Sequence, residues 1–303
     1  MNILIVGYGS IGKRHARILN DFSIVENLDL VTNKKVDGFR TFINIEDVKN
    51  LNKYDYFIIS SETYKHYGHL KFLNDKVNDK IILVEKPLFH IKIELNEVYN
   101  KIFVAYNLRF HPIIQKIKYL IANEDILFIN VRSGQYLPMW RPDSDYRNSY
   151  SSSKNKGGGA LLDLSHEIDY IQWLFGDFVI KGSIITKISD LEIDSDDIVT
   201  VIARIKNNNA LLNFTMDYLS KKPIREIIIY ANEKDIIADL IKSEITINYK
   251  NGSSENMDFK DIGRDFTYKK MHESLLNGEN TYLCSYYEGL KVLDVIEKIW
   301  SEN

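Results

Sequence analysis

The stretch Met1-Asn2-Ile3-Leu4-Ile5-Val6-Gly7-Tyr8-Gly9-Ser10-Ile11-Gly12 opens the chain and decides how its first half folds. A short apolar run leads directly into the pattern G-x-G-x-x-G, and helix-forming residues follow. Gly7 permits a tight turn, Gly9 lets a pyrophosphate approach the backbone, and Gly12 lets the helix pack on the strand. This context predicts a dinucleotide site, with Ser10 and Ile11 in the helical turn that faces the phosphates. An ordinary glycine turn between packed elements is the alternative interpretation.

The composition indicates a globular chain with a full core, because 45% of its 303 residues are hydrophobic and 27% are charged. This length allows two domains. A net charge of −3 gives no reason to expect nucleic acid or a membrane surface as a partner. The single cysteine, Cys284, suits a reducing compartment. No apolar run approaches the ~18 residues of a membrane span, and the start of the chain lacks a signal-peptide pattern, so we expect a cytoplasmic protein.

Apolar strands alternate with helical segments through the first third of the chain. Strands are predicted at 28–32, 56–61, 80–84 and 102–107. Such alternation indicates a parallel sheet with right-handed crossovers, whose ligands gather beyond the carboxyl ends of the strands. The residues at these ends, which we expect to border one site with Gly9, are Ser61, Thr63, His66, Glu85, Lys86 and Asn107.

The end of the strand at 28–32 bears on the choice between NAD and NADP. A site that prefers NAD usually places Asp or Glu there to bind the ribose 2′-hydroxyl. Here the chain reads Thr32-Asn33-Lys34-Lys35, which favours tolerance of a 2′-phosphate. A solvated turn with ordinary surface lysines explains the same residues equally well. Both cofactors therefore stay open, with Asn33 and Lys34 as candidate contacts.

The tripeptide Glu85-Lys86-Pro87 ends a strand that is predicted to be buried, where charged residues need a reason. A lysine that is partly desolvated beside a nicotinamide can lower its pKa and move a proton. Proline fixes the turn, and bonds that precede proline are where cis peptides occur. A structural ion pair at the end of the strand is the alternative interpretation.

Past Pro112 the pattern changes. A helix is predicted from 113 to 121 and a strand of a different sheet at 128–132, and an irregular stretch then ends in Gly157-Gly158-Gly159. A single helix is predicted at 160–174. Alternating segments then predict an antiparallel sheet, with strands around 179–188, 198–205, 210–217, 225–231, 236–240 and 245–249, and helices at 265–277 and 285–300 end the chain.

These motifs, in this order, resemble the Gfo/Idh/MocA oxidoreductase family. The matching stretches are Gly7–Gly12 with Arg14-His15, Thr63 with His66, Glu85–Pro87, Tyr106–Pro112 and Gly157–Gly176. The resemblance implies an α/β chain with a Rossmann domain that binds NAD(P) through a parallel sheet, at 1–112. It also implies an α+β domain with a large, mainly antiparallel open-faced sheet, at 113–303, for substrate binding and for assembly into a homodimer or homotetramer. Lys86 is then catalytic.

The family's second signature follows the glycines and here reads Asp163-Leu164-Ser165-His166-Glu167-Ile168-Asp169. Its aspartate stands one residue closer to the histidine than is usual in the family. Either His166 is the family's histidine after a deletion, or Glu167 fills its place. We prefer His166, because an imidazole can shuttle a proton near pH 7. Asp163 and His166 are therefore candidate catalytic and substrate-binding residues, with capping of a helix start as the structural alternative.

The irregular stretch around 136–150 is similar to a branch of the family found in bacterial surface-sugar synthesis, including that of nonulosonic acids. Arginines can grip a carboxylate or phosphate through two hydrogen bonds, and Tyr and Trp offer flat faces to a sugar. The alternative is a surface loop with its arginines in solvent. The candidate substrate contacts are Arg109, Tyr136, Trp140, Arg141, Tyr146 and Arg147.

The sequence therefore predicts an NAD(P)-dependent dehydrogenase or reductase that acts on a nucleotide sugar or nonulosonate in surface-glycan biosynthesis. Lys86 would take or give the hydroxyl proton while Asp163 and His166 orient the substrate between the two domains. One alternative is a sensor or regulatory protein of the same fold that binds NAD(P) and catalyses nothing. Another is an epimerase or lyase that retains its NAD. The seven histidines show no metal-ligand spacing, so no metal is expected.

Overall fold

The computed structural model describes residues 1–260 and 262–303, which form two compact units. The first unit comprises Met1–Asn107 and Asp265–Leu293, and the second comprises Leu108–Arg264 and Asp294–Asn303. The sequence predicts one division, after residue 112, whereas the first unit also includes a segment from near the end of the chain. Strand β15 (Cys284–Ser285) pairs with β6 (Lys101–Val104), and helix α6 (Phe266–Asn277) contacts α1 (Ser10–Asn20). Local patterns do not reveal such long-range packing.

The first unit contains a largely parallel sheet in the order β15-β6-β5-β4-β1-β2-β3. Its central strands are buried on both faces, as the apolar runs predict, and Ile3, Leu4 and Ile5 are fully buried. The strand order reverses between β1 and β4, and the carboxyl ends at such a point form the usual ligand site. The remaining elements of this unit are β1 (Asn2–Val6), β2 (Asn27–Val31), β3 (Arg40–Phe42), β4 (Tyr56–Ile59), β5 (Ile81–Val84), α2 (His66–Asn74) and short 3₁₀ helices at Ile45–Asp47, Leu51–Lys53 and Thr63–Lys65.

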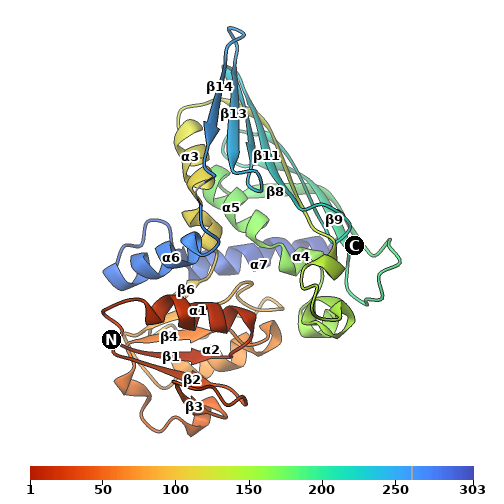
Figure 1. Cartoon of the computed structure of the whole chain (residues 1–303). Coiled ribbons are helices and arrows are strands. Elements are labelled where there is room, and N and C mark those ends of the chain that lie inside the picture. Colours follow the sequence, from red (N-terminus) through yellow and green to blue (C-terminus); the bar gives the residue numbers. More distant parts are fainter. Residues whose placement is uncertain (261) are drawn as a thin grey trace. The chain divides into compact units, whose positions relative to one another are not determined.

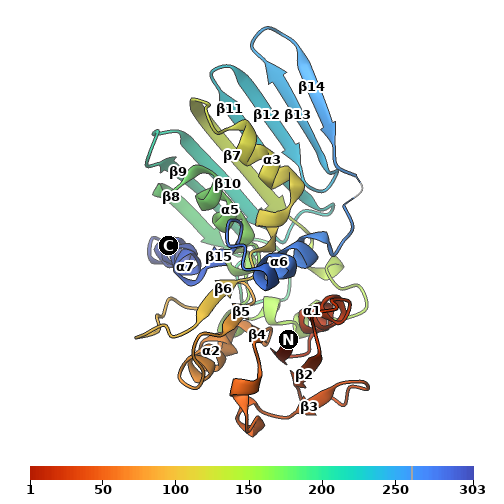
Figure 2. The ribbon, with the colours of Figure 1, turned by 90° about the vertical axis from the view of Figure 1, so that its left-hand side faces the viewer.

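The second unit contains a mainly antiparallel sheet in the order β14-β13-β12-β11-β7-β10-β9-β8, within which β7 and β10 run parallel. Figure 2 shows these strands side by side, with helices α3 (Pro112–Leu120) and α5 (His166–Phe175) lying over one face. The strands are β7 (Ile126–Gly134), β8 (Phe178–Thr186), β9 (Ile198–Ile205), β10 (Leu211–Asp217), β11 (Ile224–Ala231), β12 (Lys234–Asp239), β13 (Glu244–Tyr249) and β14 (Ser254–Asp258). The fold class predicted from the sequence is confirmed.

Side chains of this second sheet alternate between a buried and an open face. In β10, Phe214 and Met216 are buried, whereas Asn213 and Thr215 lie on the other side. A strand covered on one face only has this two-residue period. The open face mixes apolar and polar groups, and Ile202 there is 53% exposed. Strand β14, with the sequence Ser-Glu-Asn-Met-Asp, escaped prediction because it lacks an apolar pattern.

One predicted helix is two. The sequence predicts a continuous helix over 160–174, whereas α4 (Ala160–Asp163) ends at Leu164 and α5 (His166–Phe175) begins after Ser165. The apolar spacing continues across the break, so the pattern alone conceals it. The remaining helices, visible in Figure 1, are α3 (Pro112–Leu120) and α7 (Tyr286–Ser301), with 3₁₀ helices at Asn107–Phe110, Leu137–Met139, Tyr146–Asn148, Tyr150–Ser152 and Lys154–Lys156.

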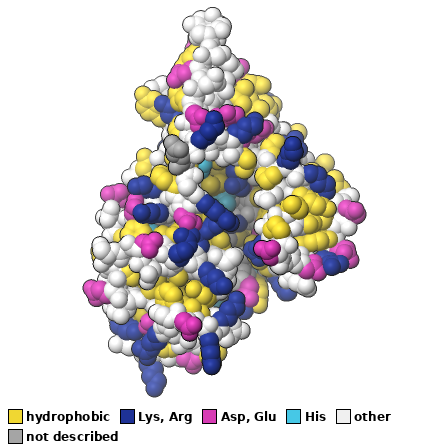
Figure 3. Space-filling model, in the orientation of Figure 1, with side chains coloured by type: hydrophobic (Ala, Val, Ile, Leu, Met, Phe, Trp, Pro, Cys, Tyr) yellow, Lys and Arg dark blue, Asp and Glu magenta, His cyan; other side chains and the backbone are white. Residues whose placement is uncertain are grey.

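Among the described helices, none combines the length and the hydropathy that crossing a membrane requires. Basic and acidic side chains are interspersed over the face shown in Figure 3, in keeping with the net charge of −3.

Candidate functional site

The glycines between β1 and α1 differ in the space around them. Gly7 has a φ of +97°, and a Cβ there would lie 2.6 Å from the backbone nitrogen of Ser61. A Cβ at Gly12 would overlap the carbonyl oxygen of Gly7. Apart from Gly9 and its two chain neighbours, no heavy atom of the described residues lies within 4 Å of a Cβ built at Gly9. Gly7 is therefore required by the close approach of the loop after β4, and Gly12 by the close approach of the turn after β1. Gly9 borders the open space that a pyrophosphate needs.

Helix α1 begins at this open space. Gly9 is its N-cap, so a side chain does not occupy the first free N–H groups, and Ser10 is exposed. Ile11 is half-buried behind it. Unpaired N–H groups and the positive end of the helix dipole favour an anion at this place. The residues of the turn thus fit the phosphates of a dinucleotide.

His66 joins two strand-end loops. Its Nε2 lies 3.0 Å from the carbonyl oxygen of Ser61, and its Nδ1 lies 3.1 Å from that of Pro87. The ring is fully buried, and burial lowers its pKa. The sequence predicts His66 as a cofactor contact, but a ring without exposed surface acts here by holding the loops together. Thr63 is also buried, whereas Ser61 is half-buried and its hydroxyl lies 3.0 Å from His69 Nδ1.

Lys86 stands just past β5, half-buried, and its peptide bond to Pro87 is cis. The neighbouring Glu85 is buried, and its carboxylate lies 2.9 Å from His15 Nε2. Its other oxygen accepts the backbone N–H of Lys86 at 3.2 Å. Glu85 therefore serves the interior of the unit rather than its surface. The sequence singles out His15 only through the family resemblance.

Asn107 stands beyond β6, where the sequence predicts a cofactor contact. Its side-chain amide donates to Thr267 Oγ1 at 2.6 Å, and both residues are buried. Thr267 lies on α6, more than a hundred residues away in the chain, so the sequence could not reveal this partner.

The turn after β2 is open to solvent. Asn33 and Lys34 are exposed, and the backbone N–H of Lys34 donates to Thr32 Oγ1 at 3.2 Å. This turn can accept either a 2′-hydroxyl or a 2′-phosphate.

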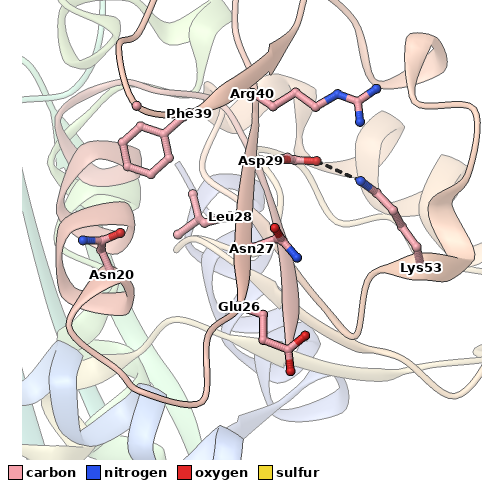
Figure 4. A pocket seen from close by; sticks show the side chains of 9 residues that line it. Asn20, Glu26, Asn27, Leu28, Asp29, Phe39, Arg40 and Lys53 are labelled. Atoms are coloured by element: carbon pink, nitrogen blue, oxygen red, sulfur yellow. Dashed lines mark hydrogen bonds and ion pairs between the residues drawn. The ribbon is translucent and has the colours of Figure 1, made fainter.

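A cavity of about 380 Å³ lies at the other end of the same strand (Figure 4). Asp29 in its wall pairs with Lys53 at 3.0 Å and accepts the hydroxyl of Tyr54 at 2.5 Å. Because the cavity borders the amino end of β2, it is separate from the carboxyl edge where dinucleotides bind.

In the second unit, the last of the three glycines at 157–159 makes room for a carboxylate. Gly159 has a φ of +117°, and a Cβ there would overlap Oδ1 of Asp196. The other oxygen of Asp196 accepts the backbone N–H of Leu161 at 2.9 Å, at the start of α4. Burial raises the pKa of Asp196 from 3.8 to about 6, and the neighbouring Asp163 adds to this shift. Sequence reasoning missed Asp196, because it lies beyond the motif that it completes.

Asp163, at the end of α4, is buried and held by tyrosine. Its Oδ2 accepts the hydroxyl of Tyr218 at 2.6 Å. Burial, together with Asp163, raises the pKa of Tyr218 and of Tyr150 well above the usual value, so both hydroxyls keep their protons. Asp163 thus has a fixed orientation in a pocket of hydroxyl groups. Tyr218 follows strand β10, and the sequence offers no signal for this role.

His166 and Glu167, the two candidates for the family's histidine position, have different surroundings. Glu167 is fully buried, and its Oε1 accepts Arg225 Nε at 2.8 Å. His166 is the first residue of α5 and is partly exposed. Glu167 is buried and held by the partly exposed Arg225, which leaves its carboxylate little freedom to move a proton, whereas the exposed surface of His166 can meet a ligand.

Arg109 lies in the interior of the second unit. Its guanidinium binds the Asp169 carboxylate, with Nη2 2.7 Å from Oδ1 and Nε 3.0 Å from Oδ2. Both residues are buried. The sequence predicts Arg109 as a substrate contact, whereas this two-point ion pair ties the entry to α3 to helix α5.

The irregular stretch at 134–159 is ordered by aromatic packing. Tyr136, Trp140 and Tyr146 pack against a small core that includes Leu137 and Tyr218. The Trp140 and Tyr218 rings meet edge to face, 5.2 Å apart. These aromatic groups therefore shape the loop from within and hold it beside Asp163.

The two arginines of this loop differ in their partners. Arg147 is exposed and pairs with Asp145 at 2.8 Å and with Glu192 at 3.0 Å. The guanidinium of Arg141, also exposed, lies 5.9 Å from the centroid of the Tyr150 ring. Arg141 is consequently the better placed of the two to meet an anionic ligand. In the described ranges, no cluster of three or more His, Cys, Asp or Glu side chains could hold a metal ion.

Residues 1–102 match the oxidoreductase family with an NAD-binding Rossmann fold, and residues 114–237 match the GFO/IDH/MocA C-terminal domain. The chain belongs to the Gfo/Idh/MocA oxidoreductase family. The predicted family and the predicted NAD-binding Rossmann domain are thereby confirmed, while the preference between NAD and NADP stays open.

Several solved structures share the fold at low sequence identity. UDP-N-acetylglucosamine 3-dehydrogenase GnnA from Acidithiobacillus ferrooxidans is 17% identical with a TM-score of 0.78, and the match covers 100% of this chain and 97% of that one. Levoglucosan dehydrogenase in complex with NADH is 17% identical with a TM-score of 0.82, covering 100% and 98%. A super-repressor mutant of Gal80p from Saccharomyces cerevisiae is 15% identical with a TM-score of 0.83, covering 100% and 95%. A comparison with curated proteins gives no match.

The space beside Gly9 leads to a first prediction. Gly9→Ala should fold normally, because its Cβ meets open space, yet it should raise the Kd for NADH ~10-fold or more, because the methyl group occupies the path of the pyrophosphate. Fluorescence titration measures the Kd and thermal unfolding checks the fold. Gly68→Ala, at another open position, is the matched control. An unchanged Kd in Gly9→Ala would remove this turn from the cofactor site. The same titration with NADPH decides between the two cofactors.

Asp196 leads to a second prediction, on pH and stability. Since folding raises its pKa from 3.8 to about 6, the folded chain binds this proton more tightly than the unfolded chain. Its contribution to the free energy of unfolding is therefore greatest at low pH and is lost as the pH rises through about 6. Between roughly pH 4 and pH 7, wild type should lose about 2 kcal/mol more than Asp196→Asn in urea unfolding.

In Asp196→Asn, the amide oxygen can still accept the Leu161 N–H. This variant therefore removes the titrating carboxyl group and keeps the hydrogen bond. Asp194→Asn is the control, because Asp194 is exposed and accepts a comparable backbone bond from Lys154 at 2.7 Å. Parallel stability profiles for wild type and Asp196→Asn would contradict the raised pKa.

Proposed function

We propose that this protein transfers a hydride between NAD(P) and a carbon atom of a sugar derivative, either a nucleotide sugar or a nonulosonate. The observation that supports the proposal is that two functional groups lie at the carboxyl edge of the first unit's sheet. The glycine turn follows β1, and half-buried Lys86 follows β5, two strands away in the same sheet. A phosphate cradle and a lysine at one edge are the parts that a nicotinamide enzyme needs to bind its cofactor and to move a proton.

The residues take separate roles in this proposal. Bound NAD(P) supplies the hydride acceptor or donor. Lys86 takes the proton of the substrate hydroxyl during oxidation or returns it during reduction. Asp163, which Tyr218 holds at 2.6 Å, orients a substrate hydroxyl, and His166 assists or relays the proton. The ion pair that holds the buried carboxylate of Glu167 to Arg225 supports His166, rather than Glu167, in this position. Correct orientation of the reacting groups supplies much of the rate.

The substrate class follows from the loop at 134–159. Its exposed Arg141 suits a phosphate or carboxylate, and its aromatic residues suit a sugar ring. Two fold relatives support a sugar, since their names are UDP-N-acetylglucosamine 3-dehydrogenase and levoglucosan dehydrogenase. We place the reaction in surface-glycan biosynthesis in the cytoplasm, where NAD(P) and nucleotide sugars are available.

A sensor that binds NAD(P) without catalysis is the second candidate, and the fold shared with the Gal80p repressor favours it. Stopped-flow measurement of nicotinamide absorbance, with a panel of nucleotide sugars and nonulosonates, separates the two functions. Binding without any redox change would favour the sensor. Turnover without net formation of NADH would indicate an epimerase or lyase that retains its cofactor.

Lys86 provides the direct test of the catalytic proposal. Lys86→Ala should lower turnover ~10²-fold or more, because the proton loses its carrier, while the Kd for NADH stays near that of wild type. Steady-state kinetics and titration give the two quantities. Lys76→Ala, at an exposed position past α2, is the control. Equal turnover in Lys86→Ala and wild type would exclude Lys86 from the mechanism.

We further propose that copies of the chain associate through the open face of the second unit's sheet, as a homodimer or homotetramer. Exposed apolar groups on this face, Ile202 at 53%, Tyr230 at 42% and Ile237 at 38%, support an interface. Light scattering should give a mass of two or four chains, and Ile202→Arg should lower it. A monomeric wild type would exclude this assembly.

A further inference from the structure

A buried chain of four polar side chains crosses the interior of the first unit. Tyr56 Oη lies 2.9 Å from His272 Nδ1, and His272 Nε2 lies 2.8 Å from His15 Nδ1. His15 Nε2 in turn lies 2.9 Å from Glu85 Oε1. The chain thus links β4, α6, α1 and the tip of β5.

Every member of the chain is shielded from water. Tyr56, His272 and His15 are 0% exposed and Glu85 is 6% exposed. A buried donor or acceptor that loses its partner cannot turn to solvent instead, so each hydrogen bond constrains the next. The chain is also too enclosed to carry protons to the surface, because its far end, Tyr56, has no exposed atoms. A positioning role therefore fits better than proton conduction.

Only one direction of donation satisfies all four groups. Burial raises the pKa of Tyr56, so the hydroxyl keeps its proton, and burial lowers the pKa of His272, so this ring is neutral. The Glu85 carboxylate can only accept, which makes His15 Nε2 a donor. If His272 donated to Tyr56, the hydroxyl hydrogen of Tyr56 would need a second acceptor, and the described residues provide only His272. Tyr56 therefore donates to His272, His272 to His15, and His15 to Glu85.

The chain ends at the backbone of the proposed catalytic lysine. Glu85 Oε1 accepts from His15, while Glu85 Oε2 accepts the backbone N–H of Lys86 at 3.2 Å. His15 lies on α1, the helix that begins at the phosphate-facing turn after Gly9. One hydrogen-bonded path therefore connects the helix of the cofactor site with the backbone of Lys86.

We infer that Tyr56, His272 and His15 are positioning residues, whose one-way hydrogen-bond chain fixes the Glu85 carboxylate and thereby the backbone of Lys86 relative to helix α1. The importance of Lys86 in this inference rests on the proposed function. The series of hydrogen bonds and its direction of donation belong to the first unit, so both can be tested without any substrate.

Nitrogen-15 NMR of the histidine rings tests the direction. The whole protein contains seven histidines, so labelling histidine gives a small set of ring signals. Single His→Gln variants assign these signals to residues. In the wild type, His272 should carry its hydrogen on Nε2, and His15 should accept at Nδ1 and donate from Nε2. Tyr56→Phe removes the first donor, so Nδ1 of His272 should lose its hydrogen bond and its nitrogen-15 resonance should shift, while the hydrogen stays on Nε2 because His15 Nδ1 still accepts it. Tyr54→Phe is the matched control, since this nearby buried tyrosine donates to Asp29 instead.

A hydrogen on Nδ1 of either ring in wild type, or identical ring spectra in wild type and Tyr56→Phe, would overturn the chain. Hydrogen exchange of the Lys86 backbone amide then tests what the chain holds. This exchange should be ~5-fold faster in Tyr56→Phe than in wild type or Tyr54→Phe, because Glu85 becomes less fixed. Equal exchange rates in all three proteins would overturn the link to Lys86.

Kinetics separate this inference from the proposed function. With a sugar that wild type turns over, Tyr56→Phe should lower kcat ~5-fold and leave the Kd for NADH within about twofold. An unchanged kcat would overturn the positioning role while leaving the proposed function intact. If no sugar is turned over, the proposed function fails, and the ring spectra and the amide exchange still decide whether the chain exists and what it holds.

Discussion

No side chain fits at Gly7 or Gly12. The position of helix α1 in the first unit depends on the close backbone contacts at these two glycines. The backbone of the turn after β1 touches the loop after β4, so α1 starts immediately beyond the strand. The N–H groups of its first turn then face the open space beside Gly9, while its buried side reaches the interior. His15 is one of the residues on that buried side, and its position beside Glu85 follows from where the helix starts. The cofactor cradle and the support of Lys86 are thus consequences of one close contact.

The second unit also depends on a position where no side chain fits, and there a carboxylate occupies the space. A side chain at Gly159 would overlap Asp196, whose carboxylate instead accepts a backbone N–H at the start of α4. The short helix ends at Asp163, and the break after it lets α5 begin with His166 partly exposed and Glu167 buried against Arg225. In both units, the absence of a glycine side chain lets neighbouring groups approach closely: the turn after β1 meets the loop after β4, and Asp196 meets the start of α4. These places are also where the proposed chemistry needs fixed donors and acceptors.

The sequence predicted much of this architecture because the relevant signals are local. Buried parallel strands are continuous apolar runs, and the open sheet of the second unit has a two-residue alternation, so both sheets could be recognised. Strands β3, β14 and β15 escaped prediction because they are short or polar. Asn107, His15 and Asp163 were recognised within the motifs. Their partners Thr267, His272 and Tyr218 were not, because each partner lies fifty or more residues away and its own surroundings in the sequence carry no signal.

The sequence by itself determined the fold class, the family and the dinucleotide turn, because periodicity, glycine placement and motif order are written in neighbouring residues. Only the tertiary structure decided which polar groups are engaged. It showed that Arg109 is held by Asp169, that His66 bridges two loops, and that Glu85 serves His15 and the Lys86 backbone. The physical reason is burial. Whether a charged or polar side chain is available to a ligand depends on which distant groups satisfy it after desolvation, and packing of the whole unit settles that.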